Sequence, residues 1–239
     1  MNWNNLELPD KNIYFQDDDS IIYCDDCRNV LPLLPDKSID LVLTDPPYGV
    51  NATYSDSYKD IKQDYWEWFL NLMPTLRRVS SITIFTHQVR ALSHILDADW
   101  VGCWYKPNAN SGRLGNSHIF PCWEPIFMYG IHDMGGLGYR KDTFVYDAQT
   151  VEANGQEHGR ERLKGGVSKG HPFPKPSSLY SELAQTFSLP QSLILDPFLG
   201  SGTTAYCAKK LGRKCIGIEI EEKYCEIAAK RCSQSVLRL

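Results

Sequence analysis

The chain has 239 residues, of which 42% are hydrophobic and 23% charged, and this composition is ordinary for a globular protein and excludes a fibrous or disordered one. No apolar stretch approaches the ~18 residues of a membrane span, and the polar, acidic first residues predict no signal peptide. The net charge of −4 argues weakly against a nucleic-acid partner, but the acids gather in the first 26 residues and basic residues gather later.

Short apolar runs alternate with amphipathic segments along the chain, which predicts an α/β sheet with helices outside it. The predicted strands are Ser20–Tyr23, Ile39–Leu43, Ser81–Phe85, Trp100–Tyr105, Pro125–Tyr129, Ser192–Leu195 and Lys214–Ile218. The predicted helices are Tyr65–Val79, Gln88–Leu96, Ser177–Phe187, one from Thr203-Thr204 to Leu211, and Glu221–Cys232, with a short helical or irregular connection from Asn29 to Leu34. The alternation of strands and helices up to Tyr105 predicts that these first strands are parallel. From Gly130 to Gly170 the periodicity is lost, which favours an insertion.

The eight cysteines are scattered, and without a secretory signal we interpret them as reduced thiols of a cytoplasmic protein. Cys24 and Cys27 form a CxxC pair, but no second pair of matching spacing follows, so no metal site is predicted. Two interpretations of the pair remain, a zinc or redox site and two small side chains at a strand-to-helix junction.

The segment Asp196-Pro197-Phe198-Leu199-Gly200-Ser201-Gly202-Thr203-Thr204 joins a buried strand to a helix. Doubly wound folds build ligand sites at such junctions, and glycines let the backbone approach a ligand closely. The next strand ends in Glu219, which suits the two hydroxyls of a ribose. A Walker loop is excluded because no Gly-Lys-Ser/Thr follows, and the third glycine of the dinucleotide fingerprint is missing. The pattern therefore favours an adenosine-containing ligand without a pyrophosphate.

A second junction, Thr44-Asp45-Pro46-Pro47-Tyr48-Gly49, follows the strand Ile39–Leu43. Two prolines and a glycine force a sharp turn that holds one carboxylate, one aromatic ring and an unpaired carbonyl at the strand end. Taken alone, such a turn either only redirects the chain or holds catalytic groups.

Together these motifs resemble the amino-group DNA methyltransferases that use S-adenosylmethionine. Asp45-Pro46-Pro47-Tyr48 is similar to the catalytic motif and Asp196–Thr204 to the cofactor motif, and the catalytic motif comes first, as in the circularly permuted β group. His171-Pro172-Phe173-Pro174-Lys175-Pro176 matches the family's His-Pro-x-x-Lys-Pro segment, and Tyr23–Cys27 matches a Gly-Asp-Cys-like segment with Asp25 in place of the glycine. The resemblance implies a Rossmann-like class I methyltransferase sheet forming one domain over residues 1–239.

The resemblance also implies roles for single residues. Asp45 and the carbonyl of Pro46 would accept the two N–H bonds of a base amine, Pro47 would hold the turn, and Tyr48 would stack on an extruded base. Asp26 would lie near the adenine, Glu219 at the ribose hydroxyls and Phe198 near the sulfonium. The residues implied at the methionine end are His171, Lys175, Ser201, Thr203 and Thr204, with Asp196, Gly200 and Gly202 completing the cofactor set.

A target-recognition insert is expected within residues 106–170. Its candidate phosphate and base contacts are Asn108, Asn110, Arg113, Asn116, Arg140, Lys141, Arg160, Arg162, Lys164 and Lys169. The alternative for each is an ordinary solvated side chain.

We therefore expect a site-specific adenine N6-methyltransferase acting on double-stranded DNA in the cytoplasm of a prokaryote or encoded by a phage, with no membrane partner. Aspartate rather than serine at the head of the turn favours adenine within this family. The alternatives are a cytosine N4-methyltransferase, a non-catalytic DNA-binding protein that retains the fold, and an enzyme that methylates RNA or a side-chain amide. A homodimer and a cognate restriction endonuclease are partners that the resemblance leaves open.

Overall fold

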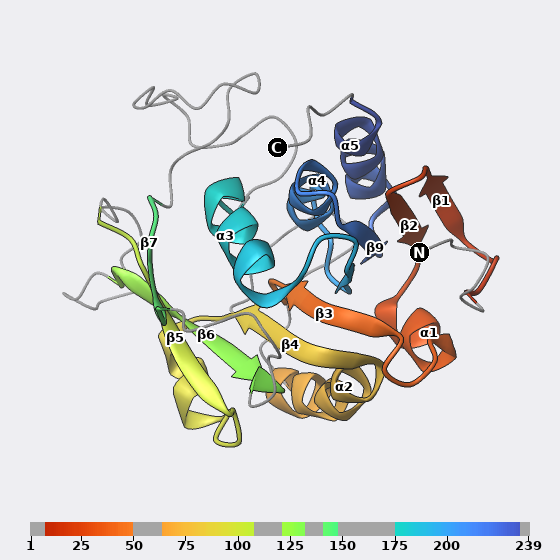
Figure 1. Ribbon diagram of the computed structural model, residues 1–239. Helices are drawn as coiled ribbons and strands as arrows, with labels where there is room; N and C mark the ends of the chain where they lie inside the picture. The colour runs from red at the N-terminus through yellow and green to blue at the C-terminus, as the bar shows by residue number, and fades with distance from the viewer. Residues whose placement is uncertain (1–7, 50–63, 108–120, 132–140, 148–174, 235–239) are drawn as a thin grey trace.

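The computed structural model describes residues 8–49, 64–107, 121–131, 141–147 and 175–234, and the strands in these ranges form one nine-stranded sheet. The strand order across the sheet is β1-β2-β9-β8-β3-β4-β6-β5-β7 (Figure 1). In chain order the strands are β1 Ile13–Gln16, β2 Ser20–Cys24, β3 Ile39–Thr44, β4 Ser80–Thr86, β5 Trp100–Tyr105, β6 Trp123–Tyr129, β7 Thr143–Val145, β8 Leu193–Asp196 and β9 Lys214–Glu219.

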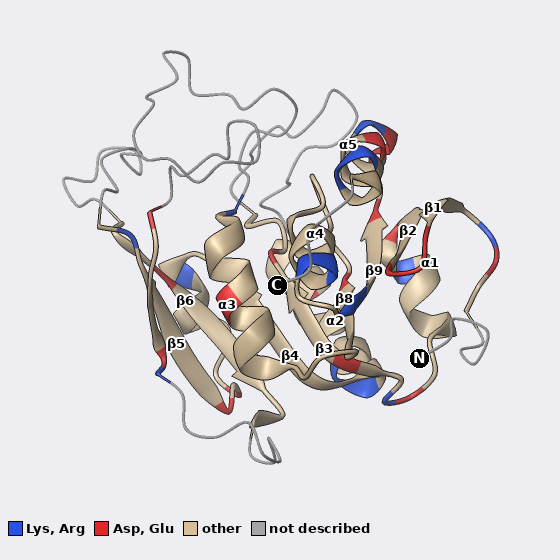
Figure 2. Ribbon diagram, turned by 45° about the horizontal axis from the view of Figure 1, so that its top comes forward, with Lys and Arg blue, Asp and Glu red and all other residues tan. Residues whose placement is uncertain are grey.

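The strands β2, β9, β8, β3 and β4 are parallel neighbours, and they form the middle of the sheet. Parallel sheets are covered on both faces, so their strands are nearly continuous apolar runs. The run Leu193–Leu195 in β8 is fully buried, as is Leu41–Leu43 in β3. In Figure 2 the strands in the middle of the sheet are mostly tan, which marks uncharged residues, whereas charged residues lie on outer elements such as α5.

Two layers of helices cover the sheet. The helices are α1 Cys27–Val30, α2 Tyr65–Val79, α3 Ser177–Phe187, α4 Thr203–Lys210 and α5 Glu222–Ser233, with short 3-10 helices η2 Leu31–Leu33 and η3 Val89–Ser93. Helices α3, α4 and α5 lie on one face, and α1 and α2 lie on the other (Figure 1). A separate hydrophobic core lies on each face of the sheet. Ile194 packs into the core under α3, α4 and α5, and its neighbour Leu195 packs into the core under α1 and α2, as expected for alternating side chains on a strand. None of the helices in the described ranges has the length and apolar character needed to cross a membrane.

The predicted strands are all present, and α2 covers the residues predicted for it. The prediction of a helix over Gln88–Leu96 is wrong, because this segment forms only the short 3-10 helix η3 and leaves Leu96 84% exposed. The first alternation of strands and helices predicts parallel strands, and β2, β3, β4 and β5 all run in the same direction. No direction is predicted for β6, which inserts between β4 and β5 and is antiparallel to both. Two edge strands, β1 and β7, were not predicted, since each is only three or four residues long.

The carboxyl ends of the parallel strands meet at one edge of the sheet. Helix α4 leads from β8 to β9 in one direction, and α2 leads from β3 to β4 in the other. The adjacent strands β8 and β3 therefore form a topological switch point, which is where open α/β sheets bind ligands. The two motifs singled out in the sequence follow these two strands.

Candidate active site

The first motif is an irregular segment that follows β3 over Asp45–Gly49 and bends at Gly49; it is called here the Asp45 turn. Gly49 has φ +65, a left-handed conformation that favours glycine. A Cβ atom on Gly49 would lie 2.5 Å from Cγ of Tyr65, in the first turn of α2. The sequence therefore needs glycine here both for the backbone turn and for the close packing of α2.

Asp45 is held by one of its two carboxylate oxygens. Its Oδ1 accepts hydrogen bonds from the hydroxyls of Thr86 (2.6 Å) and Tyr48 (2.8 Å) and lies 3.2 Å from Nζ of Lys175. Among the described residues none donates to its Oδ2 or to the carbonyl of Pro46. The side chain of Asp45 is 25% exposed. The turn thus presents two hydrogen-bond acceptors that the described part of the chain leaves open.

The ring of Tyr48 stacks on His87, with ring centroids 4.6 Å apart and planes 19° apart. Nδ1 of His87 accepts from the backbone N–H of Gln88 (2.9 Å), so its Nε2 carries the proton and donates to the hydroxyl of Tyr65 (2.7 Å). Burial, and then the nearby Lys175, lowers the pKa of His87 to about 3. Tyr48 therefore rests on a neutral, fixed imidazole that covers one face of its ring.

Lys175 lies against the Asp45 turn. Its Nζ donates to the Tyr48 hydroxyl (2.7 Å) and to Oε2 of Glu124 (3.0 Å), besides its ion pair with Asp45. Glu124, on β6, also accepts from Nζ of Lys106 at 2.7 Å. Burial works against the charge of Glu124, but Lys175 and Lys106 outweigh it and lower the pKa to about 2. The resemblance implied that Lys175 holds the methionine end of the cofactor, whereas the structure brings its ammonium to the proposed base side.

Asp196 connects the two motifs. Its Oδ1 accepts from the hydroxyl of Thr44 (2.5 Å) and the backbone N–H of Phe198 (3.0 Å), and its Oδ2 accepts from the hydroxyl of Thr204 (2.5 Å). The residue is only 3% exposed, and burial raises its pKa to about 6. Asp196 thus ties the end of β3 to the start of α4, rather than facing outward.

The second motif forms a turn over Phe198–Gly202, called here the glycine turn. Gly202 has φ +81, and a Cβ atom there would lie 2.8 Å from Cβ of Ala228 in α5. Glu219 closes the turn, because its two oxygens accept from the backbone N–H groups of Gly200 (2.8 Å) and Glu221 (2.9 Å). Burial raises the pKa of Glu219 to about 7. A carboxylate has about four acceptor positions, so the remaining lone pairs suit a diol that donates two hydrogen bonds.

The other predicted cofactor residues line the same strand ends. Phe198 meets Trp68 of α2 edge to face at 5.8 Å, and Thr203 accepts from Arg231 at 3.1 Å. Ser201 is partly exposed within the glycine turn. Asp26 caps α1 and pairs with Arg28 at 2.5 Å, next to the end of β9. These residues all follow the carboxyl ends of β2, β8 and β9 or begin the helices after them.

Many of the predicted DNA contacts lie outside the described residues. They are Asn108, Asn110, Arg113, Asn116, Arg140, Arg160, Arg162, Lys164 and Lys169, together with the cofactor candidate His171. Lys141 is described, and it is exposed just before β7.

Four residues of the site were not singled out from the sequence, namely Thr86, His87, Lys106 and Glu124. A signal for one of them existed, because Glu124 is the only charge in the otherwise apolar strand Trp123–Tyr129. Cys24 ends β2 and Cys27 begins α1, which places the pair at a strand-to-helix junction. Among the described residues no group of three His, Cys, Asp or Glu side chains is arranged to hold a metal ion.

Known proteins are similar to this chain over most of its length. Residues 39–230 match the family model of the N6/N4 methyltransferases, described as DNA methylase. The chain is 28% identical over 251 residues to the type II methyltransferase M.HinfI of Haemophilus influenzae, over 86% of this chain and 66% of that protein. The chain thus spans about two thirds of that relative's length.

Solved structures show the same fold. The PvuII DNA methyltransferase, described as cytosine-N4-specific, aligns with a TM-score of 0.68 at 16% identity, over 95% of this chain and 91% of that one. The complex of M1.HpyAVI with SAM aligns with a TM-score of 0.58 at 22% identity, over 90% of this chain and 100% of that one. The class I methyltransferase fold expected from the sequence is confirmed. Since the family model spans most of the sequence, this chain belongs to the N6/N4 family of amino-group DNA methyltransferases.

Proposed function

We propose that this protein is a site-specific adenine N6-methyltransferase that transfers a methyl group from S-adenosylmethionine to an extruded base of duplex DNA. The observation that carries the proposal is the pair of open acceptors on the Asp45 turn, Oδ2 of Asp45 and the carbonyl of Pro46. A primary amine has two N–H bonds, and the turn offers one acceptor for each.

The exocyclic amine of a base is a poor nucleophile because its lone pair is delocalised into the ring. Hydrogen bonds from both N–H groups to Asp45 and Pro46 draw the nitrogen toward tetrahedral geometry and localise that lone pair. The nitrogen then forms a bond to the methyl carbon while the carbon–sulfur bond breaks. The nitrogen afterwards loses one proton, for which the carboxylate of Asp45 is the adjacent acceptor.

S-adenosylmethionine, when bound, supplies an electrophilic methyl group on a positively charged sulfur. The residues at the glycine turn fit this cofactor. Glu219 keeps lone pairs for two ribose hydroxyls, and ordered N–H donors hold its carboxylate in place. The ring of Phe198 offers a surface that favours positive charge. The bond between Thr44 and Asp196 fixes this cofactor side relative to the Asp45 turn.

A base must leave the duplex to reach a turn at a strand end, which costs a few kcal/mol that stacking and edge hydrogen bonds offset. We assign this stacking to the face of Tyr48 that His87 does not cover. Recognition of the site is assigned to basic and amide residues within 106–170, where phosphate contacts would fix the register on the duplex. The enzyme would work in the cytoplasm.

Labelled methyl transfer tests the proposal. Unmethylated duplex DNA is incubated with methyl-labelled S-adenosylmethionine, digested to nucleosides and separated. We expect the label in N6-methyldeoxyadenosine, and none when Asp45→Ala replaces the wild type. Label in N4-methyldeoxycytidine would instead support the cytosine activity that the similarity to the PvuII enzyme favours. Cofactor binding without transfer to any DNA, or preferred transfer to RNA or protein in competition, would overturn the proposal.

A further inference from the structure

The ammonium of Lys175 has an acceptor for each of its N–H groups on the base side of the site, that is, around the Asp45 turn. It has three N–H donors, and three oxygens surround it: the Tyr48 hydroxyl at 2.7 Å, Oε2 of Glu124 at 3.0 Å and Oδ1 of Asp45 at 3.2 Å. Two of these oxygens belong to the Asp45 turn. No donor of Lys175 remains for the carboxylate of a bound methionine.

Glu124 anchors this arrangement from the neighbouring strand. Its second oxygen accepts from Nζ of Lys106, so two lysines and two carboxylates alternate in the order Lys106, Glu124, Lys175, Asp45. The side chains of Lys106, Glu124 and Lys175 are only 10–15% exposed. Buried charges of this kind are tolerated when each is paired, and removing one partner leaves an uncompensated charge.

We infer that Lys175, anchored by Glu124 and Lys106, is a positioning residue for Asp45 on the base side of the site and does not bind the cofactor. This inference rests on the proposed function, because its rate measurements require methyl transfer to DNA. Lys106, Glu124 and Lys175 are called here the ion chain.

The hydrogen bonds show how the ion chain acts. Lys175 donates to the oxygen of Tyr48, so the single hydroxyl proton of Tyr48 points to a carboxylate, either Asp45 at 2.8 Å or Glu124 at 2.9 Å. All contacts that Asp45 receives from the described residues reach its Oδ1. The carboxylate is thereby fixed in one rotamer with Oδ2 presented to the amine, and preorganised groups of this kind need no rearrangement during reaction.

The charge of Asp45 depends on the same groups. Burial raises the pKa of Asp45, the positive charge of Lys175 counteracts this rise, and the negative charge of Glu124 adds to it. The titratable or charged groups that face Asp45 or act on it are Tyr48 in its own turn, Lys175 before α3, Tyr180 in α3, Glu124 on β6 with Lys106 behind it, His87 stacked on Tyr48, and Asp196 at the end of β8. The only cation in direct contact with its carboxylate among the described residues is Lys175.

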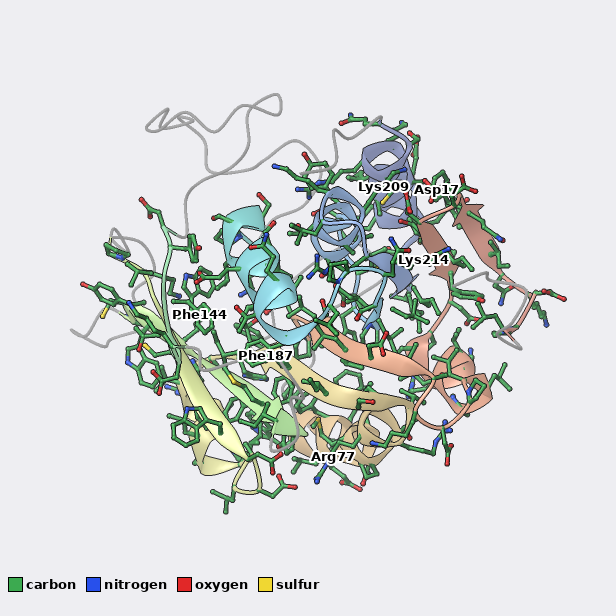
Figure 3. The ribbon with its side chains drawn as sticks, viewed as in Figure 1. Asp17, Arg77, Phe144, Phe187, Lys209 and Lys214 are labelled. Carbon is green, nitrogen blue, oxygen red and sulfur yellow. The ribbon has the colours of Figure 1, made fainter. Side chains whose placement is uncertain are left out.

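A first experiment separates the base side from the cofactor side. Lys175→Met is compared with Lys209→Met, which removes a similarly buried lysine that pairs with Asp17 at 2.6 Å near the opposite edge of the sheet (Figure 3). We expect K175M to lower the single-turnover rate at saturating cofactor by about 100-fold or more, the scale for a lost preorganised donor. Its calorimetric Kd for S-adenosylmethionine should stay close to that of the wild type, and K209M should change neither quantity.

A second experiment uses the pH dependence of the rate, which a loss of packing would not shift in a defined direction. Without Lys175 the pKa of Asp45 rises, so the acid limb of the pH–rate profile of K175M moves to higher pH. Without the charge of Glu124 that pKa falls, so the acid limb of Glu124→Gln moves to lower pH. We also expect E124Q to lower kcat, because Lys175 then loses the negative charge that anchors it.

The matched control for E124Q is Asp97→Asn. Asp97 accepts from the Tyr129 hydroxyl (3.0 Å) and from Arg77 (2.9 Å), the latter labelled in Figure 3. Tyrosine, carboxylate and cation thus also meet at the other end of β6, at an exposed position. D97N should leave the profile unchanged. The inference is overturned if K175M weakens cofactor binding tenfold or more while its rate at saturating cofactor is normal, or if K175M and E124Q shift the acid limb in the same direction. A wild type that transfers no methyl group would instead refute the proposed function, while the binding measurement would still test the role of Lys175.

Discussion

Thr44 and Asp196 are 152 residues apart in the chain, yet the hydroxyl of Thr44 donates to Oδ1 of Asp196 at 2.5 Å. Both residues are buried at the ends of adjacent strands, β3 and β8. The residue after Thr44 is Asp45, and the residues after Asp196 form the glycine turn. This hydrogen bond therefore adds a side-chain link to the pairing of β3 and β8, between the residues that lead into the two halves of the site.

Thr44→Val should weaken the link between these halves. The change keeps the shape of the side chain but removes the donor, which leaves Asp196 with fewer partners in a buried position. Hydrogen bonds to charged groups contribute about 1.5–3 kcal/mol, so we expect a loss of this order in the free energy of unfolding measured in urea. The control is Thr83→Val, which removes a buried bond between two neutral hydroxyls, from Thr83 to Ser80 (2.7 Å), and should cost less. Equal losses in the two variants would contradict the assigned role.

A pair of glycines tests the packing beneath the Asp45 turn. Gly49 and Gly212 have similar left-handed φ angles of +65 and +68, but a Cβ atom on Gly212 meets nothing within 4 Å. Gly212→Ala should therefore lose only the conformational cost of about 1–2 kcal/mol. Gly49→Ala adds a clash with Tyr65 and should lose about 1–3 kcal/mol more, together with methyl transfer. Thermal unfolding of both variants measures the difference, and similar Tm values would contradict the clash.

The sequence predicted the parts of the site that consecutive residues encode. Apolar runs located β3 and β8, and the Pro-Pro and Gly-x-Gly segments located their turns, because local patterns determine strands and turns. The contact between Lys175 and Glu124 could not be predicted in this way. It depends on β6 lying antiparallel beside β4, and that pairing is decided by the order of the whole sheet. For the same reason a resemblance of motifs assigned Lys175 to the wider cofactor set, while only the fold shows which groups surround it.

Asp45→Asn tests whether Asp45 acts as a charge or only as an acceptor. The amide keeps one acceptor oxygen and the shape of the side chain, but it cannot take up a proton and it leaves Lys175 with Glu124 as its only carboxylate among the described residues. General base catalysis typically contributes about 10²–10⁴-fold, so we expect a decrease of this size in single-turnover rate. Binding of S-adenosylmethionine should be unchanged in calorimetry. A rate near that of the wild type would mean that hydrogen bonding alone activates the amine.

Glu219 should make stability depend on pH near neutrality. Its pKa is raised by burial from 4.5 to about 7, so the folded state binds the proton more tightly than the unfolded state. Between these values the unfolded chain releases the proton first, and the contribution of Glu219 to the free energy of unfolding therefore falls as the pH rises from 4.5 to 7 and is constant above that. In Glu219→Gln the group cannot titrate, so the unfolding free energy of E219Q relative to the wild type should rise across this window, by at most about 3 kcal/mol. Urea unfolding of both proteins at pH 5, 6, 7 and 8 measures the difference. A difference that does not change with pH would show that Glu219 stays ionised in the folded protein, held by the N–H groups of Gly200 and Glu221.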